Sequence, residues 1–274
     1  MKKKLLFQIF VYSFSLLILI FALVPFLWTV VSSLKFDSDI YTASFLPTNP
    51  TLSNYISVLN DQRMMGFFFN SVKISLLSTF VSTIVAILGA YGFSRYKFPG
   101  RNMLLYSIMF TRVLPRVTLL IPFFVILSRL NMANTIQGLS LVYMIIGMPV
   151  SVWLLKGYID NIPYEIEEAA LIDGCGPIQT LVRVVIPIIS PAIAAISMFA
   201  FILSWNEFLF PRVLTTSPDV RPISVGLAFY IDDVGVRWGM LMAASVLMSI
   251  PAIIVFSFAQ KYIVHGLSEG AVKG

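Results

Sequence analysis

Six long apolar runs dominate this sequence, and each is long enough to cross a bilayer as a helix, which takes about 20 residues. They cover residues 5–31, 67–93, 103–126, 136–155, 184–205 and 238–259. Lipid offers no hydrogen-bond partners to the backbone, so only helices and closed barrels span membranes, and these runs are far too long for barrel strands. The sequence therefore predicts an all-α polytopic membrane protein with six transmembrane helices.

The charge content agrees with this prediction. Only 12% of the residues are charged, whereas a soluble domain carries about 25%. The formal charge of +6 comes from lysines and arginines that are scattered along the chain, without the basic stripe of a nucleic-acid-binding protein. We interpret them as loop charges that set orientation and contact anionic lipid, and we expect no nucleic-acid partner.

Two groups of basic residues predict the orientation in the membrane. Three lysines at positions 2–4 precede the first apolar run, which is too long for the core of a signal peptide and is interpreted as an uncleaved helix. Arg95, Lys97 and Arg101 follow the second run. Because basic residues near span ends favour the cytoplasmic side, we expect both termini and the loop at 156–183 to be cytoplasmic.

Cysteine and histidine are too few for most catalytic or metal sites. Cys175 is the single cysteine and His265 the single histidine, so an intrachain disulfide and a Cys/His metal cluster are excluded. No nucleophile–base constellation is present. The chain also lacks the G-x-x-x-x-G-K-[ST] phosphate loop. We expect no catalytic residue, no metal and no cofactor on this chain.

The loop between the fourth and fifth runs holds three glutamates, Glu165, Glu167 and Glu168. Pro163 suits the first turn of a short helix, near whose N-terminus glutamates interact favourably with the helix dipole. Gly174 is suited to end that helix. The pattern predicts a short helix with an acidic flank.

The same helix is predicted to have a small apolar stripe, formed by Ile162, Ile166, Ala169 and Ala170 at helical spacing. Ala169, Ala170 and Gly174 have almost no side chain, so the surface of another protein can approach the backbone closely. The alternative is an amphipathic helix that rests against the membrane and is held there by lipid contacts.

The sequence Glu168-Ala-Ala-Leu-Ile-Asp-Gly174, followed after nine residues by Val184-Val-Ile-Pro187, resembles the EAA loop of permeases of the type I ABC-importer fold. The resemblance implies a coupling helix seated in a cleft of a cytosolic ATPase subunit. Its contact residues would be Glu168, Ala169, Ala170, Asp173 and Gly174. The departure is Val184, where the family often has isoleucine.

Further segments narrow the resemblance to carbohydrate-importer permeases of the maltose-permease G-subunit kind, and they cover nearly the whole chain. The resemblance implies a heterodimer with a second permease in a bacterial inner membrane. It also implies two ATPase subunits that bind ATP and Mg²⁺, and an extracytoplasmic sugar-binding protein. The segments are Pro25-x-x-Trp28, Ser32-Ser-Leu-Lys35, Asn54-Tyr55, Asn70-Ser71, Ala90-Tyr-Gly-Phe-Ser-Arg95, Ser204-Trp-Asn-Glu-Phe208 and the ending from Gln260.

This organisation divides the chain into three parts. Residues 1–66 hold the first transmembrane helix and an extracytoplasmic loop. Residues 67–260 form the permease core, with five transmembrane helices and the coupling loop at 156–183. Residues 261–274 form a cytoplasmic tail.

Arg112, Arg116 and Glu207 are candidates for the translocation path. The arginines are four residues apart in the third run and are expected to share one helical face, where buried charge usually faces a polar cavity or a partner. The alternative is a shifted span with both arginines snorkelling to one interface. Glu207 pairs with an arginine or gates the outer mouth, unless this span end merely anchors Trp205 at the interface.

The predicted function is the permease subunit of an ATP-driven importer for a di- or oligosaccharide, forming half of the translocation pathway. A glycerol-phosphate or polyol importer is the alternative within this class. An ATP-independent secondary transporter would use intramembrane carboxylates, but every aspartate and glutamate here falls in a loop or near a span end. A membrane enzyme is excluded for want of a catalytic constellation.

Overall fold

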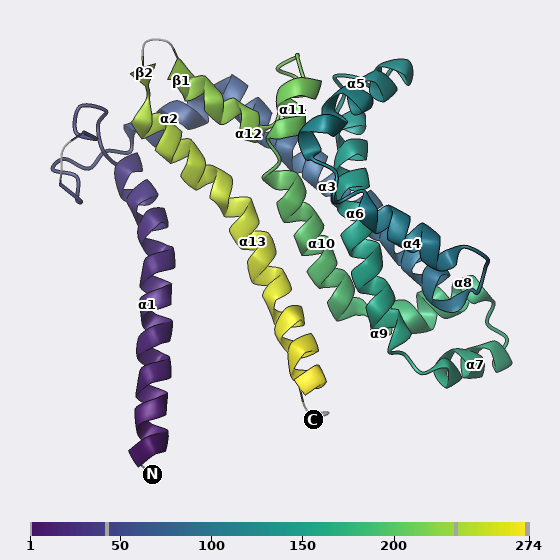
Figure 1. Ribbon diagram of the computed structural model, residues 1–274. Coiled ribbons are helices and arrows are strands. Elements are labelled where there is room, and N and C mark those ends of the chain that lie inside the picture. The colour runs from purple at the N-terminus through teal and green to yellow at the C-terminus, as the bar shows by residue number, and fades with distance from the viewer. Residues whose placement is uncertain (1, 42–43, 233–234, 272–274) are drawn as a thin grey trace. The chain divides into compact units, whose positions relative to one another are not determined.

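The chain is helical almost throughout in a computed structural model that describes residues 2–41, 44–232 and 235–271 (Figure 1). The described part confirms the predicted helical fold class, apart from one hairpin with two residues in each strand. The elements are α1 Lys2–Ser33, α2 Ser53–Asn60, α3 Gln62–Arg95, α4 Arg101–Phe110, η1 Arg116–Leu119, α5 Leu120–Arg129, α6 Ile136–Asp160, α7 Tyr164–Ile172, α8 Pro177–Thr180, η2 Leu181–Val185, α9 Ile186–Ile188, α10 Ser190–Trp205, α11 Leu209–Leu214, α12 Ile223–Gly226, η3 Leu227–Tyr230, β1 Ile231–Asp232, β2 Gly235–Val236 and α13 Trp238–Ala271.

Four helices in the described part are long and apolar enough to cross a membrane: α1, α3, α6 and α13. A fifth span is present if the bent pair Pro177–Ile188 and Ser190–Trp205 counts as one. Six spans were predicted, and the structure leaves the sixth unconfirmed. Helix α13 continues beyond the predicted span end at residue 259. The side chains of residues 262–271, with His265 among them, and all of residues 272–274 lie outside the described part.

The third apolar run accounts for this difference. It is divided into α4 and α5, with ten residues each, and turns and the 3₁₀ helix η1 lie between them. Proline lacks an N–H and disfavours helical backbone at the residue before it. Pro115 therefore separates the two helices, and neither half has the length of a span by itself.

The fifth run is bent by 82° at Ile189. Two known causes of sharp bends lie beside this residue: the π-helix η2 on one side and prolines on the other. Pro187 lies within α9, and Pro191 occupies the first turn of α10. Pro187 and Pro191 are thus associated with a sharp change of direction, and the span predicted at residues 184–205 begins with a bend.

Residues 1–65 and 226–250 form one compact unit of the chain. Buried Asn54 on α2 donates to the backbone oxygens of Ser33 and Lys35 at 2.9 and 2.8 Å and so ties α2 to the end of α1. The backbone N–H of Gly239, in the first turn of α13, donates to Asp37 at 2.8 Å. Side-chain acceptors and donors thus fix the loop that follows α1.

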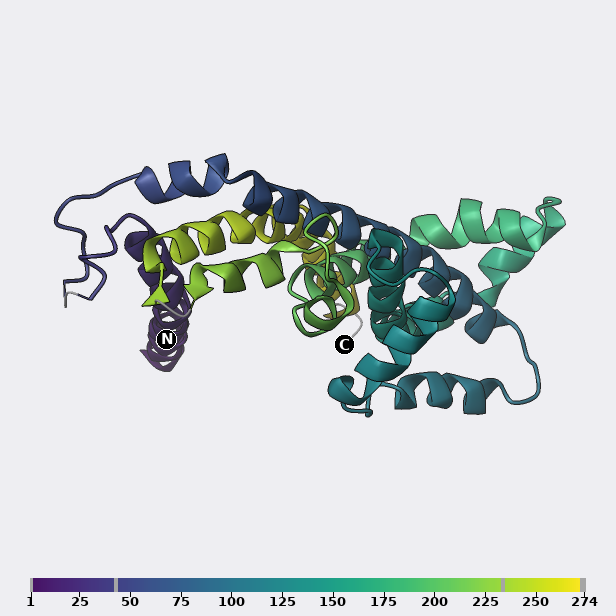
Figure 2. The same cartoon turned by 90° about the horizontal axis from the view of Figure 1, so that it is seen from above.

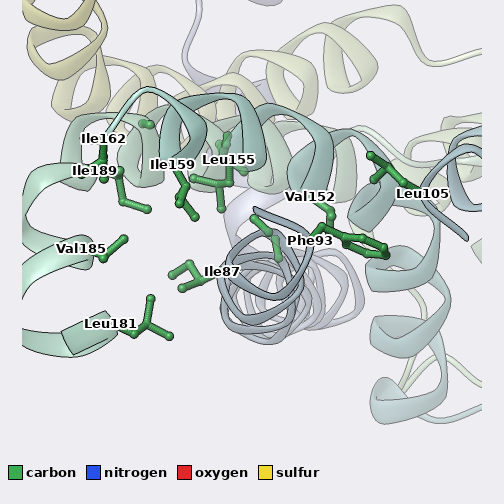
Figure 3. Close-up of a cluster of buried hydrophobic side chains, with 14 residues drawn as sticks. Ile87, Phe93, Leu105, Val152, Leu155, Ile159, Ile162, Leu181, Val185 and Ile189 are labelled. Atoms are coloured by element: carbon green, nitrogen blue, oxygen red, sulfur yellow. The ribbon is translucent and has the colours of Figure 1, made fainter. Parts of the chain in front are cut away.

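Residues 66–225 and 251–274 form the second unit, whose main core joins α3, α6 and the segment from η2 to α10 (Figure 3). Helices α6 and α10 lie side by side (Figure 1). The buried members of this cluster are Ala86, Ile87, Ala90, Phe93, Leu105, Val152, Leu155, Ile159, Ile162, Leu181, Val185, Ile189, Ala192 and Ile196.

Small polar side chains join the helices of this unit. The hydroxyls of Ser78 on α3 and Ser204 on α10 lie 2.7 Å apart, and those of Thr83 and Ser197 lie 3.0 Å apart on the same pair of helices. Small residues allow helices to approach closely in lipid, and their hydroxyls bond across the interface. The two pairs therefore fix α3 against α10.

Gly138 in the first turn of α6 is held where no side chain fits. A Cβ added there would lie 2.1 Å from the backbone oxygen of Met132, whereas a Cβ at Gly157 in the same helix would meet nothing within 4 Å. We predict that Gly138→Ala destabilises the protein by about 1–3 kcal/mol through overpacking. Gly157→Ala should be neutral or stabilising by up to about 1 kcal/mol, from helix propensity.

Thermal unfolding of the two purified variants in the same detergent, followed by tryptophan fluorescence, measures the difference. A melting temperature for Gly138→Ala equal to that of Gly157→Ala would contradict the close backbone approach at Gly138.

Candidate coupling site and polar cluster

Helix α7 begins directly after Pro163 and ends before Gly174, as the sequence predicted. The backbone N–H of Asp173 donates to Ala169 at 3.0 Å, and that of Gly174 donates to Leu171 at 3.1 Å. Gly174 has a φ of +85°, a left-handed conformation that glycine adopts without steric cost. In Figure 1 α7 lies beyond the lower end of α6, and the view from above shows it displaced to one side of α6 (Figure 2). The loop thus presents a short helix that stops sharply.

The predicted contact residues divide between two faces of this loop. Glu168, Ala169, Asp173 and Gly174 are exposed, whereas Ala170 is buried. Ala170 therefore packs inside this chain, and its surface is not open to a partner in this conformation.

The predicted apolar stripe of α7 does not form. Ile162 and Ala170 are buried, but Ile166 and Ala169 are exposed, and Ile172 is 86% exposed. Helical spacing placed these residues near one another without showing which of them would meet the rest of the chain. The exposed face of α7 thus combines apolar side chains with the carboxylates of Glu165 and Glu168.

Glu167 does not belong to the predicted acidic flank. It is 4% exposed, and its Oε1 lies 2.5 Å from Nε of Arg95, the last residue of α3. The hydroxyl of Tyr91 donates to the same carboxylate at 3.1 Å. Arg95 also donates to the backbone oxygen of Ile162 at 3.1 Å and lies 5.2 Å from the ring centre of Tyr164. A charged network therefore joins α3 to the start of α7.

This pair was not predicted as a site from the sequence. Glu167 was grouped with its two acidic neighbours, and Arg95 was assigned to a basic cluster. The available signal was the position of Glu167, three residues before buried Ala170 on the inward face, but its partner lies 72 residues earlier in the chain.

The structure brings two of the three predicted pathway residues together. Nη1 of Arg116 lies 2.9 Å from Oε2 of Glu207. The arginine side chain is 45% exposed, and the glutamate side chain is 7% exposed. Oε1 of Glu207 also accepts from the backbone N–H of Leu209 at 3.0 Å. The predicted pairing of Glu207 with an arginine is therefore present.

Arg112 and Arg116 do not share a helical face, contrary to expectation, because α4 ends at Phe110 and Arg116 begins η1. Arg112 donates to the backbone oxygen of Ile146 on α6 at 2.9 Å. Both arginines line one cavity of about 180 Å³, together with Thr111, Leu114, Leu119, Phe123, Ile145 and Ile146. They converge on this cavity through the broken backbone between α4 and α5.

A second, very small cavity lies behind Arg116 and Glu207 and includes Tyr143 and Ser204 in its lining. The Tyr143 hydroxyl is buried and has no hydrogen-bond partner among the described protein groups. Buried polar groups usually find a partner in protein or water. The ion pair and this phenol thus form a polar cluster where α6 and α10 meet.

Comparison with protein families gives the class of this chain. Residues 78–269 match the model for the binding-protein-dependent transport system inner membrane component. The chain belongs to this family. The match confirms the predicted transporter permease, and the family is one of membrane transport components and not of enzymes.

Relatives of this permease align along nearly its whole length. It is 34% identical to the trehalose/maltose transport system permease protein MalG of Thermococcus litoralis, over 100% of both chains. It is 33% identical to the sulfoquinovosyl glycerol transport system permease protein SmoH of Agrobacterium fabrum, over 94% of this chain and 91% of that one.

Among solved structures, a chain of a bacterial ABC transporter involved in the import of the acidic polysaccharide alginate matches with a TM-score of 0.81. Its sequence identity is 26%, over 96% of this chain and 98% of that one. The permease therefore has the fold of an ABC-importer membrane subunit.

The Arg116–Glu207 pair makes a prediction about stability. Glu207→Ala removes the partner of Arg116 and the acceptor for Leu209, so we expect a loss of about 1–3 kcal/mol. Glu207→Gln keeps an acceptor for the backbone N–H and should lose less. Melting temperatures of the purified permease variants test this order, with Glu165→Ala on the exposed face of α7 as the control, expected within about 0.5 kcal/mol of wild type.

If Glu207→Ala has the same melting temperature as the Glu165→Ala control, the buried carboxylate does not stabilise the fold, and the predicted stabilising role of the Arg116–Glu207 pair is wrong.

Proposed function

We propose that this permease is one membrane subunit of an ATP-driven importer for a di- or oligosaccharide, and that α7 docks onto a cytosolic ATPase subunit. The observation that carries the proposal is the exposed face of α7. The opposite side of this helix is held against α3 by the buried pair of Glu167 and Arg95. Glu168, Ala169, Asp173 and Gly174 are open to a partner, and Ala170 supports them from inside.

The physical character of this face supports docking to a protein surface. Ile172 is almost fully exposed beside Asp173, and Gly174 adds no side chain that would hold a partner away from the backbone. Exposed apolar groups surrounded by polar ones are typical of protein interaction sites. A helix resting on lipid would present an apolar face free of charge, whereas the exposed face of α7 combines apolar side chains with the carboxylates of Glu165 and Glu168.

The relatives support the remaining partners and the cargo class. Several are named as permeases of sugar uptake systems, for trehalose and maltose and for diacetylchitobiose. We therefore propose a heterodimer with a second permease, two ATPase subunits that bind ATP and Mg²⁺, and an extracytoplasmic sugar-binding protein. The relative named for sulfoquinovosyl glycerol transport supports a glyceryl glycoside as the second candidate cargo.

The proposed topology keeps six spans, with both termini in the cytoplasm of a bacterium. The third span would consist of α4 and α5 with their broken connection, and the fifth of the bent pair. Residues 1–66 would add the first span and an extracytoplasmic loop to the core at 67–260, and residues 261–274 would end in the cytoplasm. Arg112, Arg116 and Glu207 would then lie on the translocation path.

Transport would follow from rigid-body movement. Closure of the two ATPase subunits would draw the coupling helices together and switch the packing of the spans between inward- and outward-facing states, without chemistry on this chain.

The coupling role predicts the effect of a bulky residue at Gly174. Gly174→Trp should abolish co-purification with the ATPase subunits, because the indole occupies the docking face and strains a φ of +85°. Gly100→Trp is a matched control: Gly100 has a φ of +79°, and an added Cβ there likewise meets nothing within 4 Å. Retained co-purification of Gly174→Trp would refute the docking assignment.

The cargo proposal predicts ATP-dependent uptake of trehalose or maltose by vesicles that contain the permease, its partner permease, the ATPase subunits and the binding protein. Gly174→Trp should reduce that uptake to the level measured without ATP. Uptake that proceeds equally well without ATP would support a secondary transporter instead. Accumulation of a glyceryl glycoside or of glycerol phosphate, but of neither sugar, would move the cargo to the alternative class.

A further inference from the structure

The three glutamates of α7 are sorted by the fold into two roles. Glu165 and Glu168 are exposed, and only Glu167 points into the chain. A nine-residue helix that buries so little apolar surface cannot hold itself in place by hydrophobic contact, since only Glu167 and Ala170 of α7 are buried. The orientation of α7 must therefore depend strongly on the contacts of Glu167.

Arg95 is suited to act as the fixed side of that contact. Its Nε contacts Glu167, and its Nη2 donates to the oxygen of Ile162 at the same time. A planar guanidinium with several donors in fixed directions makes such simultaneous contacts, whereas a lysine ammonium on a flexible stem does not. Tyr91, one turn earlier on α3, adds a third hydrogen bond. Two successive turns of α3 thus hold one carboxylate.

Helix α3 extends from this network to the other end of the unit. Asn70 near its start donates to the backbone oxygen of Arg221 at 3.2 Å, and Ser71 accepts from the backbone N–H of Ile223 at 2.8 Å. Arg95 follows Asn70 by 25 positions, which corresponds to about 37 Å at the rise of an α-helix. One continuous helix therefore connects the α7 end of the unit with the polar loop that follows α10.

A buried ion pair is weak evidence of stability, because removing two charges from water costs about as much as their attraction returns. Its distinctive property is geometric, since it favours one arrangement of two elements. The most extensive contacts of α7 are with α8 and η2, which follow it in the chain. The contact through Arg95 leads to a different helix.

We propose that Glu167 and Arg95 are positioning residues that lock α7 to α3, so that a force applied to α7 moves α3 with it. The role in transport rests on the proposed function, but the lock itself is a property of this chain. Breaking it would free α7 without removing its docking face, and would thus separate ATP hydrolysis from transport.

The first experiment measures the lock in the purified permease in lipid nanodiscs, without ATPase or sugar. Spin labels are placed on exposed residues by Ile172→Cys on α7 and Leu88→Cys on α3, in a Cys175→Ser background. We expect one narrow distance peak with Glu167 present and loss of that peak in Glu167→Gln. The double variant with Arg95→Glu and Glu167→Arg, which exchanges the two charges, should restore the narrow peak in part. The single variant Arg95→Lys, with Glu167 in place, should not show the full narrow peak.

Two controls separate a lock from general disruption. Glu165→Gln neutralises an exposed glutamate of the same helix and should leave the α7–α3 peak narrow. A second label pair, Leu88→Cys with Tyr158→Cys, reports on α3 and α6 and should stay narrow in Glu167→Gln. A narrow α7–α3 peak in Glu167→Gln overturns the proposal, and so does broadening of both label pairs.

The second experiment measures trehalose or maltose uptake per ATP hydrolysed in the reconstituted complex. Glu167→Gln should still assemble with the ATPase but transport about fivefold less per ATP, within the range by which single residues modulate coupling. An unchanged ratio would refute the role in coupling. If the wild-type complex carries neither sugar, the cargo proposal fails, while the lock is still decided by the distance measurement.

Discussion

The absence of water in the hydrocarbon core is the constraint on which the rest of this structure depends. Every backbone polar group there must find its partner within the protein, so long helices form and each interruption needs local compensation. At the interruption between α4 and α5, the hydroxyls of Thr111 and Thr118 donate to the backbone oxygens of Ile108 and Pro115. The charges beside the interruption also have partners, since Arg112 donates to the oxygen of Ile146 and Arg116 pairs with Glu207.

The sequence was sufficient where the signal is local. Apolar runs located α1, α3, α6 and α13, because a long stretch without charges has few alternatives to a helix in lipid. Prolines in the third and fifth runs were equally visible, and they predicted a break in each run but not the extent of that break. Whether Pro115 kinks a helix or separates two depends on distant acceptors such as Ile146 and Glu207, and no periodicity within the run contains that information.

The candidate coupling loop shows the same division between local and tertiary information. Pro163 and Gly174 marked the ends of α7 correctly, because a helix start and a left-handed stop are properties of a few neighbouring residues. The sorting of Glu165, Glu167 and Glu168 was missed, since it depends on Arg95. Three acidic residues within four consecutive positions were interpreted as one flank. In a helix, however, successive side chains are rotated by about 100° around the axis, so neighbouring residues lie on different faces.

The surroundings of α7 explain why movement there would spread to several helices at once. Glu167 connects α7 to α3 through Arg95, while contacts with α8 and η2 connect it to the segment that bends by 82° into α10. Helices α3 and α10 are in turn joined by hydroxyl pairs and by the core around Ile87 and Val185 (Figure 3). Close-packed interiors transmit displacement instead of absorbing it. A displacement of α7 therefore reaches both helices by separate routes, and because the two are also joined to each other, they would move as one body.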